Sequence, residues 1–99
     1  MLDITKTTNG SELTVALTGR LDTITAPALE KELRSSLDGV TKLVIDMAAL
    51  EYISSAGLRV LLWAQKVMNA QGEMLVLHVS DTILEIFEVT GSSDILTIA

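Results

Sequence analysis

The chain contains no cysteine, one histidine and only three aromatic residues among its 99 residues. The lack of cysteine excludes disulfides, thiolate nucleophiles and thiolate metal ligands, and it fits a reducing compartment. The single histidine, His78, has no second imidazole with which to share a metal ion, and its place in an apolar run indicates a structural role. We therefore expect no metal site. Three aromatic side chains are also too few to form a base-stacking platform for nucleic acid.

Basic residues are scarce as well. Seven Lys and Arg residues stand against thirteen Asp and Glu residues, which gives a net charge of −6. Such a chain repels nucleic acid and anionic lipid, so we expect neither nucleic acid nor membrane among its partners. The longest apolar helix candidate, residues 56–70, is too short and too polar to span a bilayer. The N-terminus lacks the basic and apolar segments of a signal peptide, which predicts a soluble, cytoplasmic protein.

The chain is rich in aliphatic residues. Hydrophobic residues make up 48% of it, and most of them are Leu, Ile, Val and Ala. This content suffices for a single domain over residues 1–99. Asn9-Gly10 predicts a tight hairpin between two strands. Hydrophobic periodicity and turn residues predict the individual elements. Strands are expected at 2–8, 13–18, 42–46 and 74–79. Three helices are expected: one capped by Thr25, one spanning 56–70, and one starting at 80–82 with a Thr82/Glu85 capping box. Residues 95–98 fit either a short strand or an extended tail.

The alternation of strands and helices predicts an α/β fold. Strands separated by helices pair in parallel through right-handed crossovers, whereas the first hairpin is antiparallel. We therefore expect a mixed, mostly parallel sheet of four to five strands with helices packed on it.

The segment 52–62 is the main candidate for a functional site. It places Ser54 and Ser55 where a strand passes into a helix N-terminus, which has unpaired N–H groups and favours negative charge. A phosphate can be held there, although one serine capping the helix would also explain the pattern. Gly57 would leave room for the backbone of a partner. Arg59 lies four residues after Ser55 and is close enough to influence an anion.

Three further features suggest sites outside these serines. Asp22 and Asp46 follow strands, and at one sheet edge two carboxylates could serve a hydrolase, although ordinary loop solvation explains them as well. Trp63, with Leu58 and Leu62 nearby, could form an exposed apolar patch that anchors a partner, or simply cover the core.

Taken together, several motifs resemble one family across nearly the whole chain. They are Tyr-Ile-Ser-Ser-Ala-Gly-Leu-Arg-Val-Leu-Leu at 52–62, Gly-Arg-Leu-Asp at 19–22, Ala-Pro-Ala-Leu at 26–29, Leu-Val-Ile-Asp at 43–46 and Gly-Glu-Met at 72–74. This combination resembles the STAS-domain anti-sigma factor antagonists, and it predicts a STAS-like domain over residues 1–99.

The resemblance implies a bacterial, partner-switching regulator of transcription. The unphosphorylated antagonist would bind an anti-sigma factor that is also a serine kinase, and sigma factor would be released. Phosphorylation of a serine at the start of the second helix would end the complex, and a PP2C-type phosphatase would restore the binding form. ATP and Mg²⁺ belong to the kinase, so the chain would be a substrate without a cofactor, and not an enzyme.

The resemblance also assigns site residues. Many relatives read Asp-Ser-Ser-Gly or Asp-Ser-Thr-Gly where this chain has Ser-Ser-Ala-Gly at 54–57. Ser54 replaces the aspartate and Ala56 replaces the second hydroxyl, which leaves Ser55 as the expected phosphorylation site and Ser54 as the alternative. The expected partner surface comprises Asp22, Thr23, Ser54, Ala56, Gly57, Leu58, Arg59, Leu62 and Trp63.

Two other functions stay open from the sequence. STAS-like domains also serve as soluble interaction subunits of transport ATPases or other signalling complexes. A small-molecule or nucleotide binder is the third class, with Asp22 and Asp46 as its candidate hydrolytic groups.

Overall fold

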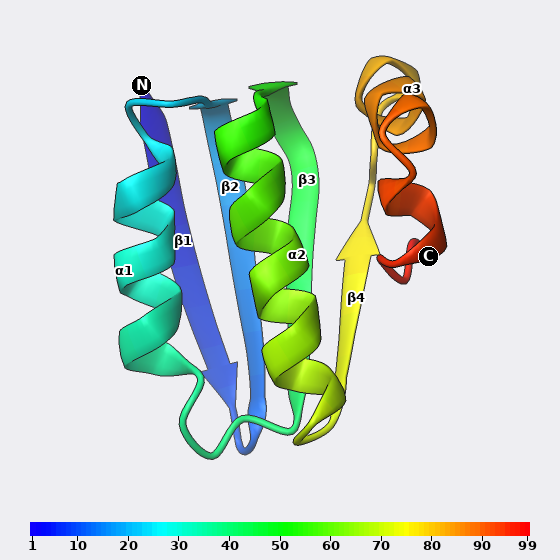
Figure 1. Ribbon diagram of the computed structural model, residues 1–99. Coiled ribbons are helices and arrows are strands. Elements are labelled where there is room, and N and C mark those ends of the chain that lie inside the picture. The colour runs from blue at the N-terminus through cyan, green and yellow to red at the C-terminus, as the bar shows by residue number, and fades with distance from the viewer.

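In the computed structural model, which describes all 99 residues, a four-stranded sheet carries three α-helices (Figure 1). The sheet has the order β1-β2-β3-β4, in which β1 is antiparallel to β2 and the other neighbours are parallel. This arrangement confirms the predicted mixed, mostly parallel sheet. The elements are β1 (Leu2–Asn9), β2 (Glu12–Leu21), α1 (Ala26–Ser36), β3 (Lys42–Ile53), α2 (Ser55–Asn69), β4 (Glu73–Leu77), α3 (Asp81–Val89) and a 3₁₀ turn (Ser92–Asp94).

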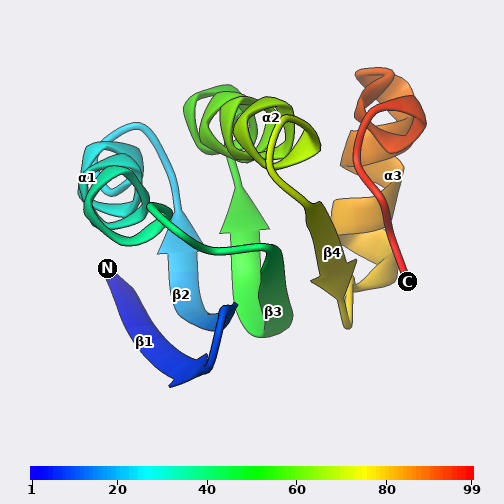
Figure 2. The same cartoon turned by 90° about the horizontal axis from the view of Figure 1, so that it is seen from below.

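The helices are distributed unevenly over the sheet. Figure 2 shows α1 and α2 side by side on one face, whereas α3 lies beyond the β4 edge. The opposite face carries no helix. None of the three helices has the length and apolar character needed to cross a membrane.

The core lies between the sheet and helices α1 and α2. In β2, Leu13, Val15 and Leu17 are buried, as their period of two predicted. The leucine stripe of α1 (Leu29, Leu33 and Leu37) is buried as well. On α2 the predicted core face is confirmed except for Val67, which is only partly buried: Val60, Leu61, Ala64 and Met68 are in the core.

The β1–β2 hairpin forms where Asn9-Gly10 predicted it. Asn9 pairs with Glu12, and Gly10 adopts a left-handed φ of 62° in the turn. Only glycine takes this backbone conformation without steric cost, which explains why the chain reverses here.

Strands β2 and β3 are longer than expected. The prediction ended β3 at Asp46, but the strand continues to Ile53, and β2 continues to Leu21. The pairing register shifts between Ala16 and Thr18 and again between Gly19 and Arg20. Such bulges break the alternation of inward and outward side chains, so periodicity alone loses the strand there.

Two helix caps differ from prediction. Thr25 occupies the cap position of α1, but its hydroxyl donates to the Arg20 carbonyl at 2.8 Å and caps no helical amide. On α3 the cap is Ser80, whose hydroxyl accepts from the Ile83 amide at 3.3 Å, so the predicted Thr82 capping box was wrong.

His78 also differs from expectation. It lies just after β4, is exposed, and has a left-handed φ of 59°, so it is not a buried residue within a strand. The C-terminal segment makes a single parallel bridge, from Ile98 to Val76, and is thus closer to an extended tail than to a fifth strand.

Candidate functional site

The candidate site lies where β2 and β3 end and α2 begins. Leu21 and Ile53 are paired at the ends of the two strands, and both are buried. The Ser54 amide then donates to the Leu21 carbonyl at 2.9 Å, which joins the start of α2 to the end of β2. The first turn of α2 is therefore fixed to the carboxyl edge of the sheet.

The two serines have different roles at this edge. Ser54 is the N-cap, and its hydroxyl accepts a long hydrogen bond from the Gly57 amide at 3.4 Å. Ser55 is the first residue of the helix, and its side chain is exposed and makes no hydrogen bond within the protein. Capping is thus carried out by Ser54, and the Ser55 hydroxyl stays accessible over the positive end of the helix dipole.

Gly57 faces the interior and not a partner. It is buried, and a Cβ atom at this position would lie 2.5 Å from Cγ of Leu21 and 3.0 Å from the Leu21 carbonyl oxygen. The expectation that Gly57 makes room for a partner's backbone was therefore wrong. Its small size is needed for the close approach of α2 to β2.

The predicted apolar patch on α2 is not formed. Leu58 is only 5% exposed and belongs to the core, while Leu62 and Trp63 are half-buried and pack against the core. The guanidinium of Arg34 on α1 lies over the Trp63 ring, 4.4 Å from its centroid. Trp63 is thus covered by the neighbouring helix.

The loop from Asp22 to Thr25 borders the site and is held by its own hydrogen bonds. One carboxylate oxygen of Asp22 accepts from the amides of Ile24 and Thr25, both at 3.0 Å. These bonds, with that from the Thr25 amide first, lower the pKa of Asp22 below its usual range, because they favour the charged form. Asp22 therefore shapes the loop, and Thr23 and Ile24 are presented to solvent.

The expected partner surface omitted three residues at this edge. Ile24 is 86% exposed, and an aliphatic residue within the polar run Asp-Thr-Ile-Thr was the available signal. Tyr52 is 38% exposed, and the Arg20 guanidinium lies 4.3 Å from its ring centroid. Arg and Tyr are enriched at interface hot spots, so these residues add to the candidate surface.

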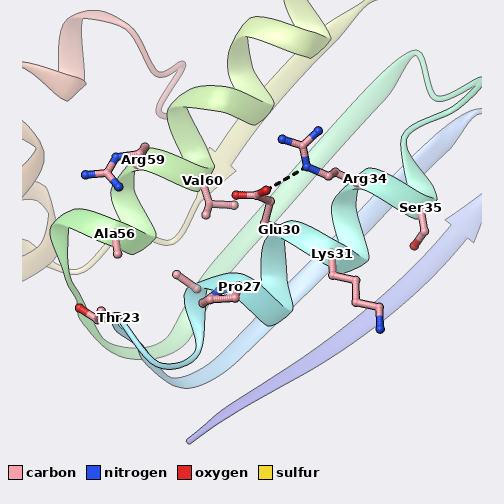
Figure 3. Close-up of a pocket in the computed structure, with 10 residues that line it drawn as sticks. Thr23, Pro27, Glu30, Lys31, Arg34, Ser35, Ala56, Arg59 and Val60 are labelled. Carbon is pink, nitrogen blue, oxygen red and sulfur yellow. Dashed lines mark hydrogen bonds and ion pairs between the residues drawn. The ribbon is translucent and has the colours of Figure 1, made fainter.

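A groove of about 610 Å³ lies between α1 and α2 beside this edge. Figure 3 shows Thr23 and Ala56 near its end, Val60 toward Glu30, and Arg59 projecting from α2 on the side away from α1. The groove thus brings together Thr23, Ala56 and Arg59 from the predicted surface. Its lining residues are Thr23, Ala26, Pro27, Glu30, Lys31, Arg34, Ser35, Ala56, Arg59 and Val60.

Asp46 lies away from this edge. It is seven positions before the end of β3, where it accepts from the Ala48 amide at 3.0 Å and pairs with Nδ1 of His78 at 2.9 Å. These two hydrogen bonds, the backbone bond first, lower the pKa of Asp46. Asp22 and Asp46 therefore do not share one edge, and of the two alternatives for these carboxylates the paired hydrolytic site is not formed.

Comparison with known proteins decides the family. The family model described as "STAS domain" matches residues 3–99. The chain belongs to the STAS domain family.

Two relatives of this STAS domain are named as regulators. The anti-sigma-B factor antagonist of Staphylococcus aureus is 33% identical over 97 residues, which cover 96% of this chain and 90% of that protein. BtrV of Bordetella bronchiseptica, named provisionally as an anti-sigma factor antagonist, is 38% identical over 89 residues, which cover 88% and 77% of the two chains.

The fold has close structural neighbours. The anti-sigma factor antagonist SpoIIAA from Bacillus superposes in its unphosphorylated form with a TM-score of 0.84 over 98% of this chain and 88% of that one, at 18% identity. Its phosphorylated form superposes with a TM-score of 0.77 over 98% and 91% of the two chains. At this identity the likeness confirms the fold.

Proposed function

We propose that this STAS domain is an anti-sigma factor antagonist controlled by phosphorylation of Ser55. The unphosphorylated chain binds an anti-sigma factor that is a serine kinase, and the complex dissociates once Ser55 carries a phosphate. A PP2C-type phosphatase returns the chain to its binding form. The chain itself acts as a binding module and a kinase substrate, and the kinase brings the ATP and Mg²⁺.

The observation that carries this proposal is that the two serines differ in structural role. Ser54 caps α2 and is half-buried, whereas Ser55 is exposed with an unbonded hydroxyl. A kinase can therefore reach Ser55 without breaking the helix cap. The names of the Staphylococcus and Bordetella relatives support the choice of partner, and a phosphorylated form of SpoIIAA shows that this fold can carry the modification.

The chemistry of the added group explains release. A phosphate brings about −1.5 to −2 charges at neutral pH. The helix N-terminus stabilises those charges while water surrounds them. In a desolvated interface, the phosphate would face the partner's carboxylates or bound nucleotide, and a thousand-fold loss of affinity requires only about 4 kcal/mol. A change of charge alone is therefore sufficient for the switch.

The test uses Ser55→Asp and Ser55→Ala in affinity capture from a native lysate, followed by peptide mapping for phosphate. We expect Ser55→Ala to retain an anti-sigma factor kinase and Ser55→Asp to lose it, with phosphate on Ser55 in the wild-type chain. Ser54→Ala is the matched control, because it removes the neighbouring hydroxyl and leaves the acceptor in place.

Two results would contradict the proposal. Unchanged binding by Ser55→Asp would show that charge at this position does not control the complex. Phosphate on Ser54 alone would move the switch to the capping serine. Capture of a transport ATPase in place of a kinase would instead favour a soluble interaction subunit.

A further inference from the structure

The face of the sheet that carries no helix has an aliphatic strip along β3 and β4 (Figure 2). Val44 is only 7% exposed, yet it lies outside the hydrophobic core, whereas its chain neighbours Leu43 and Ile45 belong to the core. Leu75, which pairs with Val44, and Leu77 are half-buried and do not pack against the core either. Because side chains alternate along a strand, these three aliphatic residues lie on the helix-free face.

Charged side chains lie at both ends of this strip, on the same face by the same alternation. At the end where the strands begin, the Lys42 ammonium is 3.8 Å from Glu12 and 3.9 Å from Glu73. At the other end, the Asp46 carboxylate pairs with Nδ1 of His78 at 2.9 Å. Along β3 a cation thus precedes the strip and an anion follows it. Along β4 an anion precedes the strip and an imidazole follows it. The strip and these flanking groups are called the open face below.

The open face is self-complementary about the Val44–Leu75 pair. Lys42 and Asp46 stand two residues before and two residues after Val44. When two copies stack their open faces with antiparallel strands, a two-fold axis through this pair sets Lys42 of each copy against Asp46 of the other. The same axis brings the carboxylate at the start of β4 toward the imidazole that follows β4 in the second copy. Opposite charges therefore meet at both ends of the strip, and the aliphatic residues meet in the middle.

The size of the open face suits a weak dimer. Four strands about 4.8 Å apart, averaging about nine residues at roughly 3.3 Å each, form a face of roughly 550 Å². Standard interfaces bury about 800 Å² on each partner, and weak ones bury less. Each copy also has a net charge of −6, which opposes association elsewhere on the surface. The dimer is therefore expected to depend on protein concentration.

We propose that the open face binds a second copy of this chain, with the two sheets stacked face to face and their strands antiparallel. Sheets that bury apolar faces against each other regularly stack about 10 Å apart with nearly aligned strands. The inference is independent of the proposed function. Because α2 lies on the opposite face of the sheet, the dimer leaves both copies of Ser55 exposed and presents two such sites to a partner.

The first experiment is sedimentation velocity on a dilution series from millimolar to micromolar concentration. We expect the wild type to shift from dimer to monomer on dilution. Leu75→Glu should weaken the dimer by about ten-fold or more, because two carboxylates then meet at the axis. Val89→Glu is the matched control, since it makes the same charge change at an aliphatic residue that is 80% exposed on α3, and it should behave as wild type.

Two results of this experiment would contradict the proposal. A wild-type chain that stays monomeric over the whole range does not use the open face for self-association. Equal weakening by Leu75→Glu and Val89→Glu would mean that added charge, and not its position, opposes the dimer. Circular dichroism checks that both variants are folded.

The second experiment tests the orientation by cross-linking and does not depend on the folding of Leu75→Glu. The chain has no cysteine, so an introduced cysteine is the only thiol in each copy. With a short bismaleimide, Leu75→Cys should link to itself and Val89→Cys should not. A mixture of Lys42→Cys and Asp46→Cys should give more dimer than either variant alone. Efficient linking of Lys42→Cys to itself would indicate parallel strands and overturn the proposed stacking.

The outcomes are separable from those of the proposed function. Loss of the Ser55 switch would leave the dilution series and the cross-links unchanged, and a monomeric chain would leave the switch intact. Wild type and Leu75→Glu are also compared in the capture from lysate. A protein that only the wild type retains, together with an absence of self-association, would name a different occupant of the open face and overturn the inference.

Discussion

At the scale of single residues, Gly57 and Leu21 set the geometry of the site. Leu21 is fully buried at the end of β2, and the α2 backbone approaches it so closely at Gly57 that no Cβ fits without a shift. The glycine is therefore a packing requirement of the fold at the point where the candidate surface begins.

Gly57→Ala is expected to lower the free energy of unfolding by about 1–3 kcal/mol, the usual cost of overpacking a core. Urea unfolding followed by circular dichroism measures this change. Ser55→Ala, two residues earlier and exposed, should stay within about 0.5 kcal/mol of wild type. A Gly57→Ala variant as stable as wild type would show that α2 can move away from Leu21.

The sequence predicted the serine site better than its surroundings. The strand-to-helix position of Ser54 and Ser55 followed from local patterns, and the structure places both where expected. The burial of Leu58 and the packing of Gly57 against Leu21 could not be predicted, because each depends on how closely α2 approaches β2. Exposed Ile24 was missed for a different reason, because the hydrogen bonds of Asp22 fix the loop that presents it to solvent.

At the scale of elements, the order of strands and helices was predictable, but several ends were not. The inward residues Met47, Leu50 and Ile53 are spaced by three along the second half of β3, where bulges interrupt the pairing with β2. A spacing of three does not occur in a regular strand, so the hydrophobic pattern did not indicate that β3 continues past Asp46.

Helix α3 provides a direct comparison of the predicted and the observed cap. Ser80→Ala removes the hydroxyl that accepts from the Ile83 amide and should cost about 1 kcal/mol. Thr82→Ala, at the position the sequence favoured, should cost much less. Amide hydrogen exchange in the first turn of α3 reports the local effect, and equal losses in both variants would contradict the assignment of the cap to Ser80.

At the scale of the whole molecule, three carboxylates link stability to pH. The pKa values of Asp22, Glu32 and Asp46 are lowered in the fold, that of Glu32 mainly by a hydrogen bond and ion pair with Lys6 at 2.7 Å. A lowered pKa means that the native state binds these protons less readily than the unfolded chain does. The resulting stabilisation is fully present above the unfolded pKa values.

We therefore expect the free energy of unfolding to fall as pH drops below about 4, through the unfolded and then the folded pKa values of these groups. Urea unfolding from about pH 7 to about pH 2.5 measures the slope. Combining Asp22→Asn, Glu32→Gln and Asp46→Asn should flatten it, whereas Glu51→Gln, an exposed carboxylate with no partner, should not. An unchanged slope in the triple variant would assign acid sensitivity to other groups.

The close seating of α2 on Leu21 has a consequence for any chemistry at Ser55. The hydrogen bond from the Ser54 amide to the Leu21 carbonyl and the close contact at Gly57 hold the first turn of α2 against β2, so this turn cannot move further toward the core. A bulky or charged substituent on the Ser55 hydroxyl therefore cannot be buried and must project from the surface into solvent. A macromolecule that approaches this surface contacts the added group directly. Its binding can therefore respond to one covalent modification without a conformational change in the domain.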